Sequence, residues 1–364
     1  MAISRLHGGL WSILSLHVIV LACAVHSAAP SDKPAVKLGE PIEVSVDEMA
    51  AAHAVLLGDS ESIAIVGTTN LRDDAYPEKS PPSGAIVNLR TKKVQRFTNG
   101  HTTGIYNVVG TADGSRIVTA GAFHEGLIRV WDFKAGKQAD PIRIPPVDDT
   151  SNMLDIGRFH RSNRIAAALP DRVSIFDLAG REERLDLTAD YLSNSYPNMP
   201  TVSPDDKSLA CHTHYSQVLV WDIGTKKVLF AASLLPVGAE RYDWSISDTA
   251  FLKSGTQLIV ARGSAAPGNE EVPKDTAETK VPAEKRGLWL IDVAKQKTIP
   301  LGMGHTRRIQ SMALHPSDEW IATIGDSWAD KPKIAGESHG ELRIWGSSVK
   351  SVLLVSQKEE HAVS

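Results

Sequence analysis

Short runs of alternating apolar and polar residues recur along the chain, and most close on an aromatic or apolar residue followed by an aspartate. Alternation with a period of two residues is the pattern of a β-strand, so each run predicts one strand. The clearest run is Leu127–Asp132, and Gln217–Asp222 repeats it with the same closing Trp-Asp pair. The other copies are weaker: Arg172–Asp177, Leu288–Asp292, Glu341–Gly346 and Ala85–Asn88.

The spacing of these runs indicates how many strands separate them. The positions aligned with the closing aspartate are 88, 132, 177, 222, 292 and 346, so the successive intervals are 44, 45, 45, 70 and 54 residues. A shorter apolar run precedes each closing run, and most of these follow a turn rich in Gly, Pro, Asp and Ser, such as 112–115 and 203–207. Intervals of this length and order match one four-stranded propeller blade. The sequence therefore predicts an all-β fold, a β-propeller of four-stranded antiparallel blades.

Over residues 41–357 the chain resembles the WD40 repeat family. The best copy runs from Gly100-His101 to Trp131-Asp132 and has the family's Gly-His pair, turn and Trp-Asp pair in order; a second runs from Gly304-His305 to Trp345. The resemblance implies a buried network in which His101, Thr119 and Trp131 share hydrogen bonds. The family's aspartate in that network is replaced by Glu125, Tyr215 and His339 in the three repeats that close on Trp, so an incomplete network is expected. The positions matched to the family's repeat motif are His101, Thr119, Trp131, Asp132, Asp177, Trp221, Asp222, Asp292, His305 and Trp345.

Six blades are predicted, with seven, the usual number in that family, as the alternative. After Gly346 the chain has room for one outer strand, 351–355, and before Met49 for at most one strand, 41–46. We expect these two terminal strands to close the ring, because closure hides sheet edges.

The two long intervals indicate insertions at one place in the blade, between its second and third strands. The predicted insertions are 264–286 in blade five and 325–340 in blade six, and 70–83 holds the same place in blade one. They should emerge on one face and adjoin once six blades close into a ring, and repeat proteins tend to place insertions on the binding face. The alternative is that they are solvated loops without function. The predicted binding residues are Asp73, Asp74, Tyr76, Trp328, Asp330 and Lys331.

The first 29 residues are typical of a secretory signal. Arg5 is the only charged side chain before Asp32, the stretch 10–25 is mainly apolar, and small residues follow at 27–29. Cleavage near 27–29 is one reading; acylation of Cys23 after a loose lipobox, or an uncleaved anchor, are the others. Residues 30–40 are expected to form a leader and 358–364 a polar tail. We expect an exported protein that is periplasmic, envelope-attached or secreted, and that meets a membrane only through a Cys23 lipid or an uncleaved signal.

Composition and motifs point to binding rather than to chemistry. The net charge is −4 and the basic residues are scattered, which gives no indication of a nucleic-acid partner. The chain contains no G-x-S-x-G, H-E-x-x-H or C-x-x-C motif and no glycine-rich phosphate loop. His212 and His214 share one side of a strand, but no third metal ligand is evident, so neither a metal nor a cofactor is predicted. We expect a monomeric, non-catalytic scaffold that binds another protein; the alternative is a lactonase-like or quinoprotein-like enzyme that uses the propeller's central pocket.

Overall fold

A computed structural model provides the structure of the chain. It describes residues 50–57, 61–68, 82–97, 101, 105–121, 127–132, 137–138, 142–143, 155–178, 184–189, 197–213, 216–234, 244–264, 287–302, 309–315, 317–327, 339–346 and 352–356. The chain divides into two compact units, a smaller one that contains β1–β9 and a larger one that contains β10–β25 together with residues 111–113.

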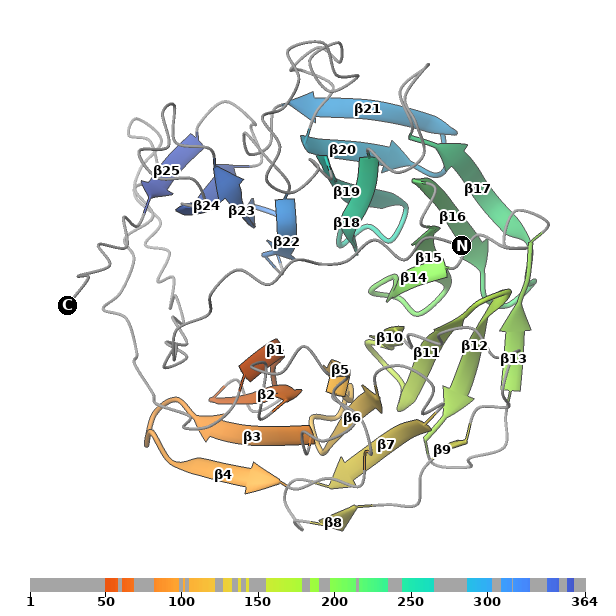
Figure 1. Cartoon of the computed structure of the whole chain (residues 1–364). Helices are drawn as coiled ribbons and strands as arrows, with labels where there is room; N and C mark the ends of the chain where they lie inside the picture. Colours follow the sequence, from red (N-terminus) through yellow and green to blue (C-terminus); the bar gives the residue numbers. More distant parts are fainter. Residues whose placement is uncertain are drawn as a thin grey trace, which may run out of the picture. The chain divides into compact units, whose positions relative to one another are not determined.

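The smaller unit consists of two sheets that follow each other in the sequence (Figure 1). Blade one contains β1 (Ala50–Leu56), β2 (Ser62–Thr68), β3 (Pro82–Asn88) and β4 (Val94–Phe97). Blade two contains β5 (Ile105–Gly110), β6 (Arg116–Gly121), β7 (Leu127–Asp132) and β8 (Lys137–Gln138), and β9 (Ile142–Arg143) also pairs with β7.

The larger unit consists of four sheets, again in sequence order. Blade three contains β10 (Asp155–Arg158), β11 (Arg164–Leu169), β12 (Arg172–Asp177) and β13 (Arg184–Leu187). Blade four contains β14 (Pro197–Val202), β15 (Ser208–Thr213), β16 (Gln217–Asp222) and β17 (Val228–Ser233). Blade five contains β18 (Trp244–Phe251), β19 (Gln257–Ser264), β20 (Gly287–Asp292) and β21 (Lys297–Gly302). Blade six contains β22 (Ile309–Leu314), β23 (Trp320–Ser327), β24 (His339–Gly346) and β25 (Val352–Ser356).

These sheets confirm the predicted fold class. In each sheet the first four strands pair as antiparallel neighbours in sequence order, and the six sheets are the blades of a six-bladed β-propeller. The outer strand predicted at 351–355 is β25, one residue later. The signal, the leader, the strand predicted at 41–46 and the tail at 358–364 lie outside the described residues, so these boundaries remain predictions.

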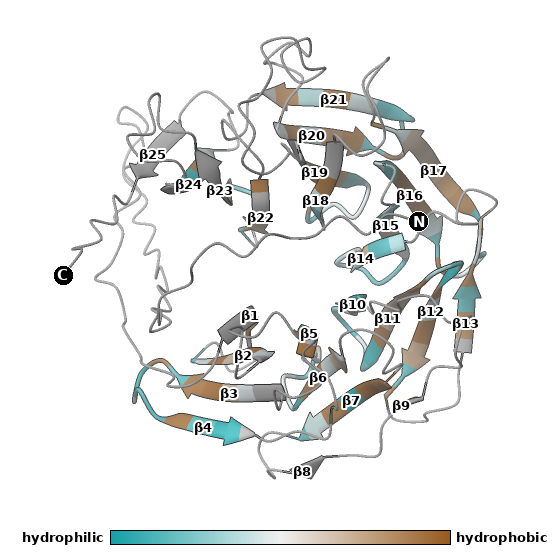
Figure 2. Ribbon diagram, in the orientation of Figure 1, coloured by the Kyte–Doolittle hydropathy of each residue, from teal (hydrophilic) through white to brown (hydrophobic). Residues whose placement is uncertain are grey.

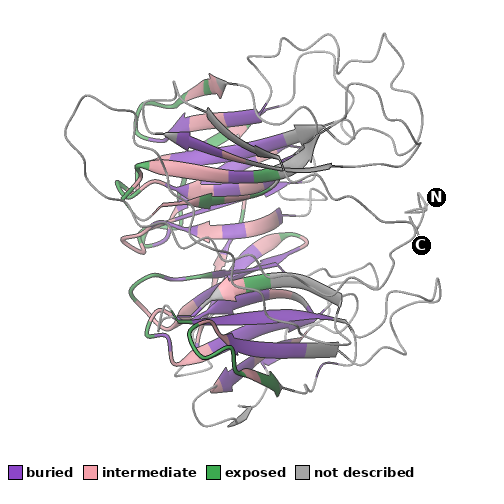
Figure 3. Cartoon of the chain, turned by 90° about the vertical axis from the view of Figure 1, so that its left-hand side faces the viewer, coloured by how far each residue is buried: buried purple, intermediate pink, exposed green. Residues whose placement is uncertain are grey.

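The middle strands of each blade are apolar because both faces of the sheet are covered. In β15, Leu209 and Cys211 pack against blade three, whereas Ala210 packs against blade five. In β16 the residues also alternate between these two core clusters. Figure 3 shows the resulting burial, with exposed residues mostly at one end of the strands. The thiol of Cys211 is fully buried, and burial raises its pKa above the ordinary value.

Candidate interaction surface

Each blade has two different ends. At one end, which we call the turn end, a tight turn joins the first strand to the second and another joins the third to the fourth. A backbone hydrogen bond holds these turns together: Ile223 donates to the Lys207 carbonyl at 2.8 Å in blade four, and Val293 donates to the Thr256 carbonyl at 3.0 Å in blade five. At the other end, the loop end, the connection from the second to the third strand leaves the sheet, and so does the connection from the fourth strand to the next blade.

The long connections lie at the loop end, as predicted. They are 69–81 between β2 and β3, 265–286 between β19 and β20, and 328–338 between β23 and β24. The last is shorter than the predicted insertion 325–340, because both strands of that hairpin extend further and pair up to Ser327 and His339. The six predicted binding residues, Asp73, Asp74, Tyr76, Trp328, Asp330 and Lys331, lie in these connections and outside the described residues.

Two of these connections leave neighbouring sheets. Blades five and six share a core cluster that contains Ile259 and Leu288 from blade five and Ile309 and Trp345 from blade six. Connections 265–286 and 328–338 therefore begin at the same end of two packed sheets. The predicted proximity of 69–81, which belongs to the smaller unit, remains a prediction.

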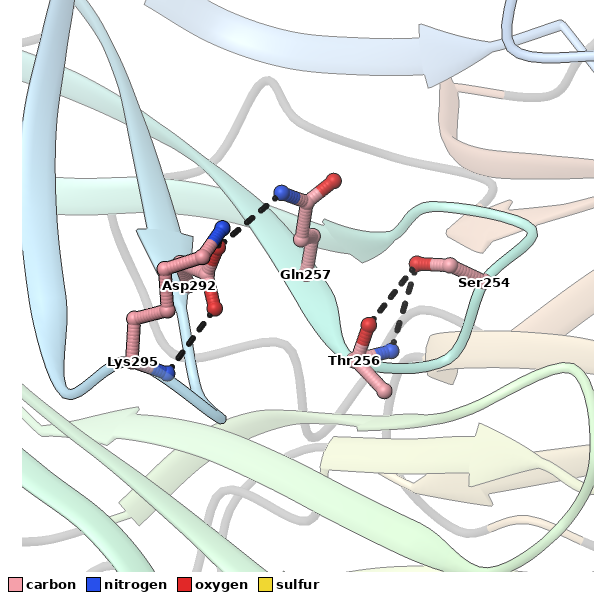
Figure 4. A network of polar contacts seen from close by, with 5 residues as sticks. All are labelled: Ser254, Thr256, Gln257, Asp292 and Lys295. Carbon is pink, nitrogen blue, oxygen red and sulfur yellow. Dashed lines mark hydrogen bonds and ion pairs between the residues drawn. The ribbon is translucent and has the colours of Figure 1, made fainter.

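In blades four and five, the aspartate that closes the repeat caps the turn that follows it. In blade four, Asp222 Oδ1 accepts hydrogen bonds from the backbone nitrogen and the hydroxyl of Thr225 at 2.7 and 2.8 Å. In blade five, Asp292 Oδ1 accepts from the Lys295 nitrogen at 3.0 Å, and its Oδ2 accepts from Lys295 Nζ at 2.8 Å (Figure 4). These bonds favour the carboxylate form, so the pKa of both aspartates is lowered. The role is local and structural.

Other carboxylates at the turn end accept hydrogen bonds from the backbone of the neighbouring blade. Asp206 of blade four accepts hydrogen bonds from the backbone nitrogens of His160 and Arg161 in blade three at 2.7 and 3.0 Å. Asp318 of blade six accepts from the Lys253 nitrogen of blade five at 2.7 Å. Both aspartates have a positive φ, 63° and 62°, in the left-handed region that Asp and Asn tolerate better than most residues. The sequence placed both residues in turns but gave no indication of their partners.

The buried network implied by the resemblance is present in blade two. His101 Nε2 lies 2.8 Å from the Thr119 hydroxyl, and Trp131 Nε1 donates to the same oxygen at 3.1 Å. All three side chains are buried. In blade six, Trp345 Nε1 donates to the Thr323 hydroxyl at 2.9 Å, so the Trp–Thr pair recurs. Glu125 and His305 lie outside the described residues.

In blade four, the buried indole of the repeat has a different hydrogen-bond acceptor. Cys211 occupies the place that Thr119 and Thr323 hold in blades two and six. The indole of Trp221 is fully buried and donates instead to the backbone carbonyl of Thr188 at 3.2 Å. Blade three has Phe176 at the place of the tryptophan and Ala167 at that of the threonine, so it buries no indole nitrogen there. Each buried indole therefore has an acceptor, either a threonine hydroxyl in blades two and six or a backbone carbonyl in blade four, because a buried donor needs one.

Comparison with known families agrees with this geometry. Residues 92–132, which include the His101–Thr119–Trp131 network, match the model of the WD40 family, described as WD domain, G-beta repeat. Residues 92–132 thus match one WD40 repeat, and the six-bladed propeller is consistent with a WD40-type protein. No curated protein matches the chain. WD40 propellers are commonly protein-interaction scaffolds, and the family is typically non-enzymatic.

Carboxylates also hydrogen-bond the first strands of neighbouring blades to each other. Asp155 of β10 accepts a hydrogen bond from the Met199 nitrogen of β14 at 3.0 Å. Asp248 of β18 accepts from the Met312 nitrogen of β22 at 2.8 Å and from the Ser311 hydroxyl at 3.3 Å. Burial outweighs these bonds and raises the pKa of Asp248 to about 6. Sequence reasoning missed both residues, although each is the one acidic residue of its strand, β10 or β18.

Asp248 should make the stability of the larger unit depend on pH. Its folded pKa of about 6 exceeds the ordinary 3.8, so its stabilising contribution is complete below pH 4 and is lost as the pH rises through 6. The loss is on the order of 3 kcal/mol. Asp248→Asn cannot titrate, so the unfolding free energy of wild type relative to this variant, measured by denaturant titration, should fall between about pH 4 and 6 and level off at higher pH. A difference that stays constant with pH would contradict the assignment.

The metal site considered from sequence finds no support in the described residues. Within them, no three His, Cys, Asp or Glu side chains are grouped closely enough to hold a metal ion. His212 is buried on β15, whereas His214 lies outside the described residues. Nor do we find, in the part of the chain that is described, any helix with the length and apolarity that a membrane crossing requires.

Proposed function

We propose that this propeller protein is a non-catalytic binding scaffold of the cell envelope or exterior, and that it holds another protein at its loop end. The observation that carries the proposal is the position of the long connections. Segments 69–81, 265–286 and 328–338 all join the second strand of a blade to its third, although they occur in three different blades.

The turn end supports the same choice by contrast. Its turns are short, and many of their polar groups are already used within the protein: Asp222 and Asp292 cap their own turns, and Asp206 and Asp318 hold neighbouring blades. A rigid frame at one end and long connections at the other is how binding loops are commonly presented.

Within these connections we propose Tyr76 and Trp328 as the anchors of the interface. Aromatic side chains supply a large contact area at a low cost in conformational entropy, and they dominate measured interface energies. Asp73, Asp74, Asp330 and Lys331 would form a polar rim around them and set the orientation of the partner.

Export is the second part of the proposal, and it rests on the N-terminal sequence. The charged start, apolar middle and small-residue exit of residues 1–29 are the features of a secretory signal. The partner is therefore expected in the periplasm, at the envelope or outside the cell.

The experiment is affinity capture of the tagged protein from its native envelope fraction, with mass spectrometry of both the bait and the captured proteins. We expect the bait to begin near residues 27–30 or at an acylated Cys23, and to retain one partner stoichiometrically. Tyr76→Ala combined with Trp328→Ala should weaken that partner's binding at least tenfold, because truncation of an interface anchor costs about 2 kcal/mol.

The matched control changes the turn end instead. Lys92→Asn combined with Lys93→Gln alters two exposed residues there and should leave capture unchanged. Replacement of all three long connections by short turns should abolish capture while circular dichroism still reports the propeller. A partner that binds this triple replacement as tightly as wild type would refute the proposed binding face.

A further inference from the structure

An apolar pair lies beside a lysine pair at the turn end of blade four. Lys226 and Lys227 are exposed in the turn before β17, and Val228 and Leu229, the first residues of that strand, are 41% and 38% exposed. Among the described residues only Ile324 is another large hydrophobic side chain with such exposure. Figure 2 shows β17 mostly in the hydrophobic colours, although it is the outermost strand of its blade. Two cations and two aliphatic groups thus share one exposed site.

Two features of the backbone at this site oppose pairing with another strand. The Leu229 carbonyl accepts a hydrogen bond from Gln296 Nε2 of blade five at 2.7 Å. The pairing of β17 with β16 is also irregular there, with a register shift next to Trp221. Irregular, capped edges discourage strand addition. The exposed side chains are therefore the recognition elements that this site offers.

The same hydrogen bond joins the site to a second lysine-bearing turn. Lys295 and Lys297 flank Gln296 and are exposed, so each of the two joined turns carries two lysines; we call residues 226–229 and 295–297 the lysine patch. The acidic residues of these two turns, Asp222 and Asp292, are drawn inward as turn caps, and Asp292 is only 6% exposed. The Lys295 ammonium is paired with Asp292 at 2.8 Å, so Lys226, Lys227 and Lys297 supply the other positive charges of the patch.

We propose that the lysine patch contacts the surface of an anionic phospholipid bilayer. Lysines gain attraction from anionic headgroups, while short aliphatic side chains beside them enter the interfacial region. The turn end suits a flat partner, because the turns that bear the patch are tight and no long connection leaves the blades there. The proposal does not depend on protein binding at the loop end, which lies at the opposite end of each blade.

The chain contains a matched control for this patch. The tetrapeptide Thr91-Lys92-Lys93-Val94 of blade one repeats Thr225-Lys226-Lys227-Val228, and Lys92 and Lys226 share a left-handed φ of 59° and 60°. In blade one, however, Val94 is half-buried and the exposed polar Gln95 stands where blade four has Leu229. The two turns thus carry the same lysines, and only blade four adds the exposed aliphatic pair.

The test is co-sedimentation with vesicles of pure phosphatidylcholine and of phosphatidylcholine with phosphatidylglycerol. The readout is the ratio of binding to anionic over neutral vesicles, which cancels any contribution of the N-terminus. Lys226→Asn with Lys227→Gln should lower that ratio about 30-fold at low salt. Lys92→Asn with Lys93→Gln should change it less than about threefold, and Val228→Thr with Leu229→Thr should lower binding to anionic vesicles about tenfold.

Three results would overturn the proposal. The first is a wild-type protein with no preference for anionic vesicles. The second is an equal loss from both lysine pairs, which would indicate general charge attraction without a defined patch. The third is retention on immobilised polyglutamate, lost only in the Lys226 and Lys227 variant, without vesicle binding, which would assign the patch to an acidic polypeptide. Asn at the left-handed position keeps the turn conformation accessible, and unchanged thermal unfolding of each variant checks the fold.

Discussion

Replacement of Gly157 by alanine is expected to destabilise the larger unit by about 3–5 kcal/mol, the range of severe overpacking. Gly157 lies on β10, where a Cβ atom would stand 1.9 Å from the carbonyl oxygen of Pro200 on β14. The added Cβ atom would meet a main-chain atom of a strand in the neighbouring blade, and such an atom cannot move away as the end of a flexible side chain can. Denaturant unfolding followed by circular dichroism measures the loss.

Gly224→Ala is the control for this prediction. Gly224 is exposed in the turn after β16, and an added Cβ would meet only the Asp222 Oδ1 atom, at an ordinary 3.5 Å. Its stability should stay within about 0.5 kcal/mol of wild type. If Gly157→Ala were as mild as Gly224→Ala, β10 and β14 could not approach each other as closely as the structure has them.

Thr119→Val is expected to cost about 2–4 kcal/mol, because valine keeps the shape of threonine but removes a hydroxyl that two buried rings share. His101 Nε2 and Trp131 Nε1 would each lose this hydrogen bond. The effect should appear in the unfolding free energy of the smaller unit, which contains all three residues.

A double-mutant cycle separates the indole bond from the rest. Trp131→Phe removes the indole donor and leaves the Thr119 hydroxyl with His101. The two single changes should therefore be non-additive by about 1 kcal/mol, the size of one buried hydrogen bond. Strict additivity would mean that the contact between Trp131 and Thr119 does not contribute to stability.

The repeats could be located from sequence because their signals are local. Alternation within β7, β12 and β16 and the turn residues between strands act over a few positions. The loop boundary in blade six was less accurate: the sequence placed the insertion at 325–340, whereas β23 and β24 continue to pair up to Ser327 and His339. Strand extension there depends on cross-strand hydrogen bonds, which composition does not report.

The partners of individual polar side chains were harder to predict. The resemblance matched Trp221 to the family's repeat motif without giving a partner for its indole, which donates to Thr188, 33 residues earlier, because Cys211 stands where a threonine would accept. The resemblance was accurate for Trp131, whose blade has the threonine at the matching place. The difference between these blades could be seen only once strand register was known.

The sequence by itself determined the all-β class, the six four-stranded blades and the position of the long connections, since periodicity, turn chemistry and repeat spacing are written locally along the chain. Tertiary structure alone decided that Asp206 accepts hydrogen bonds from His160 and Arg161, that Asp248 accepts one from Met312, and that Gln296 joins two lysine-bearing turns. These contacts join residues of different blades. Their geometry depends on how sheets pack face to face, and no local pattern specifies that packing.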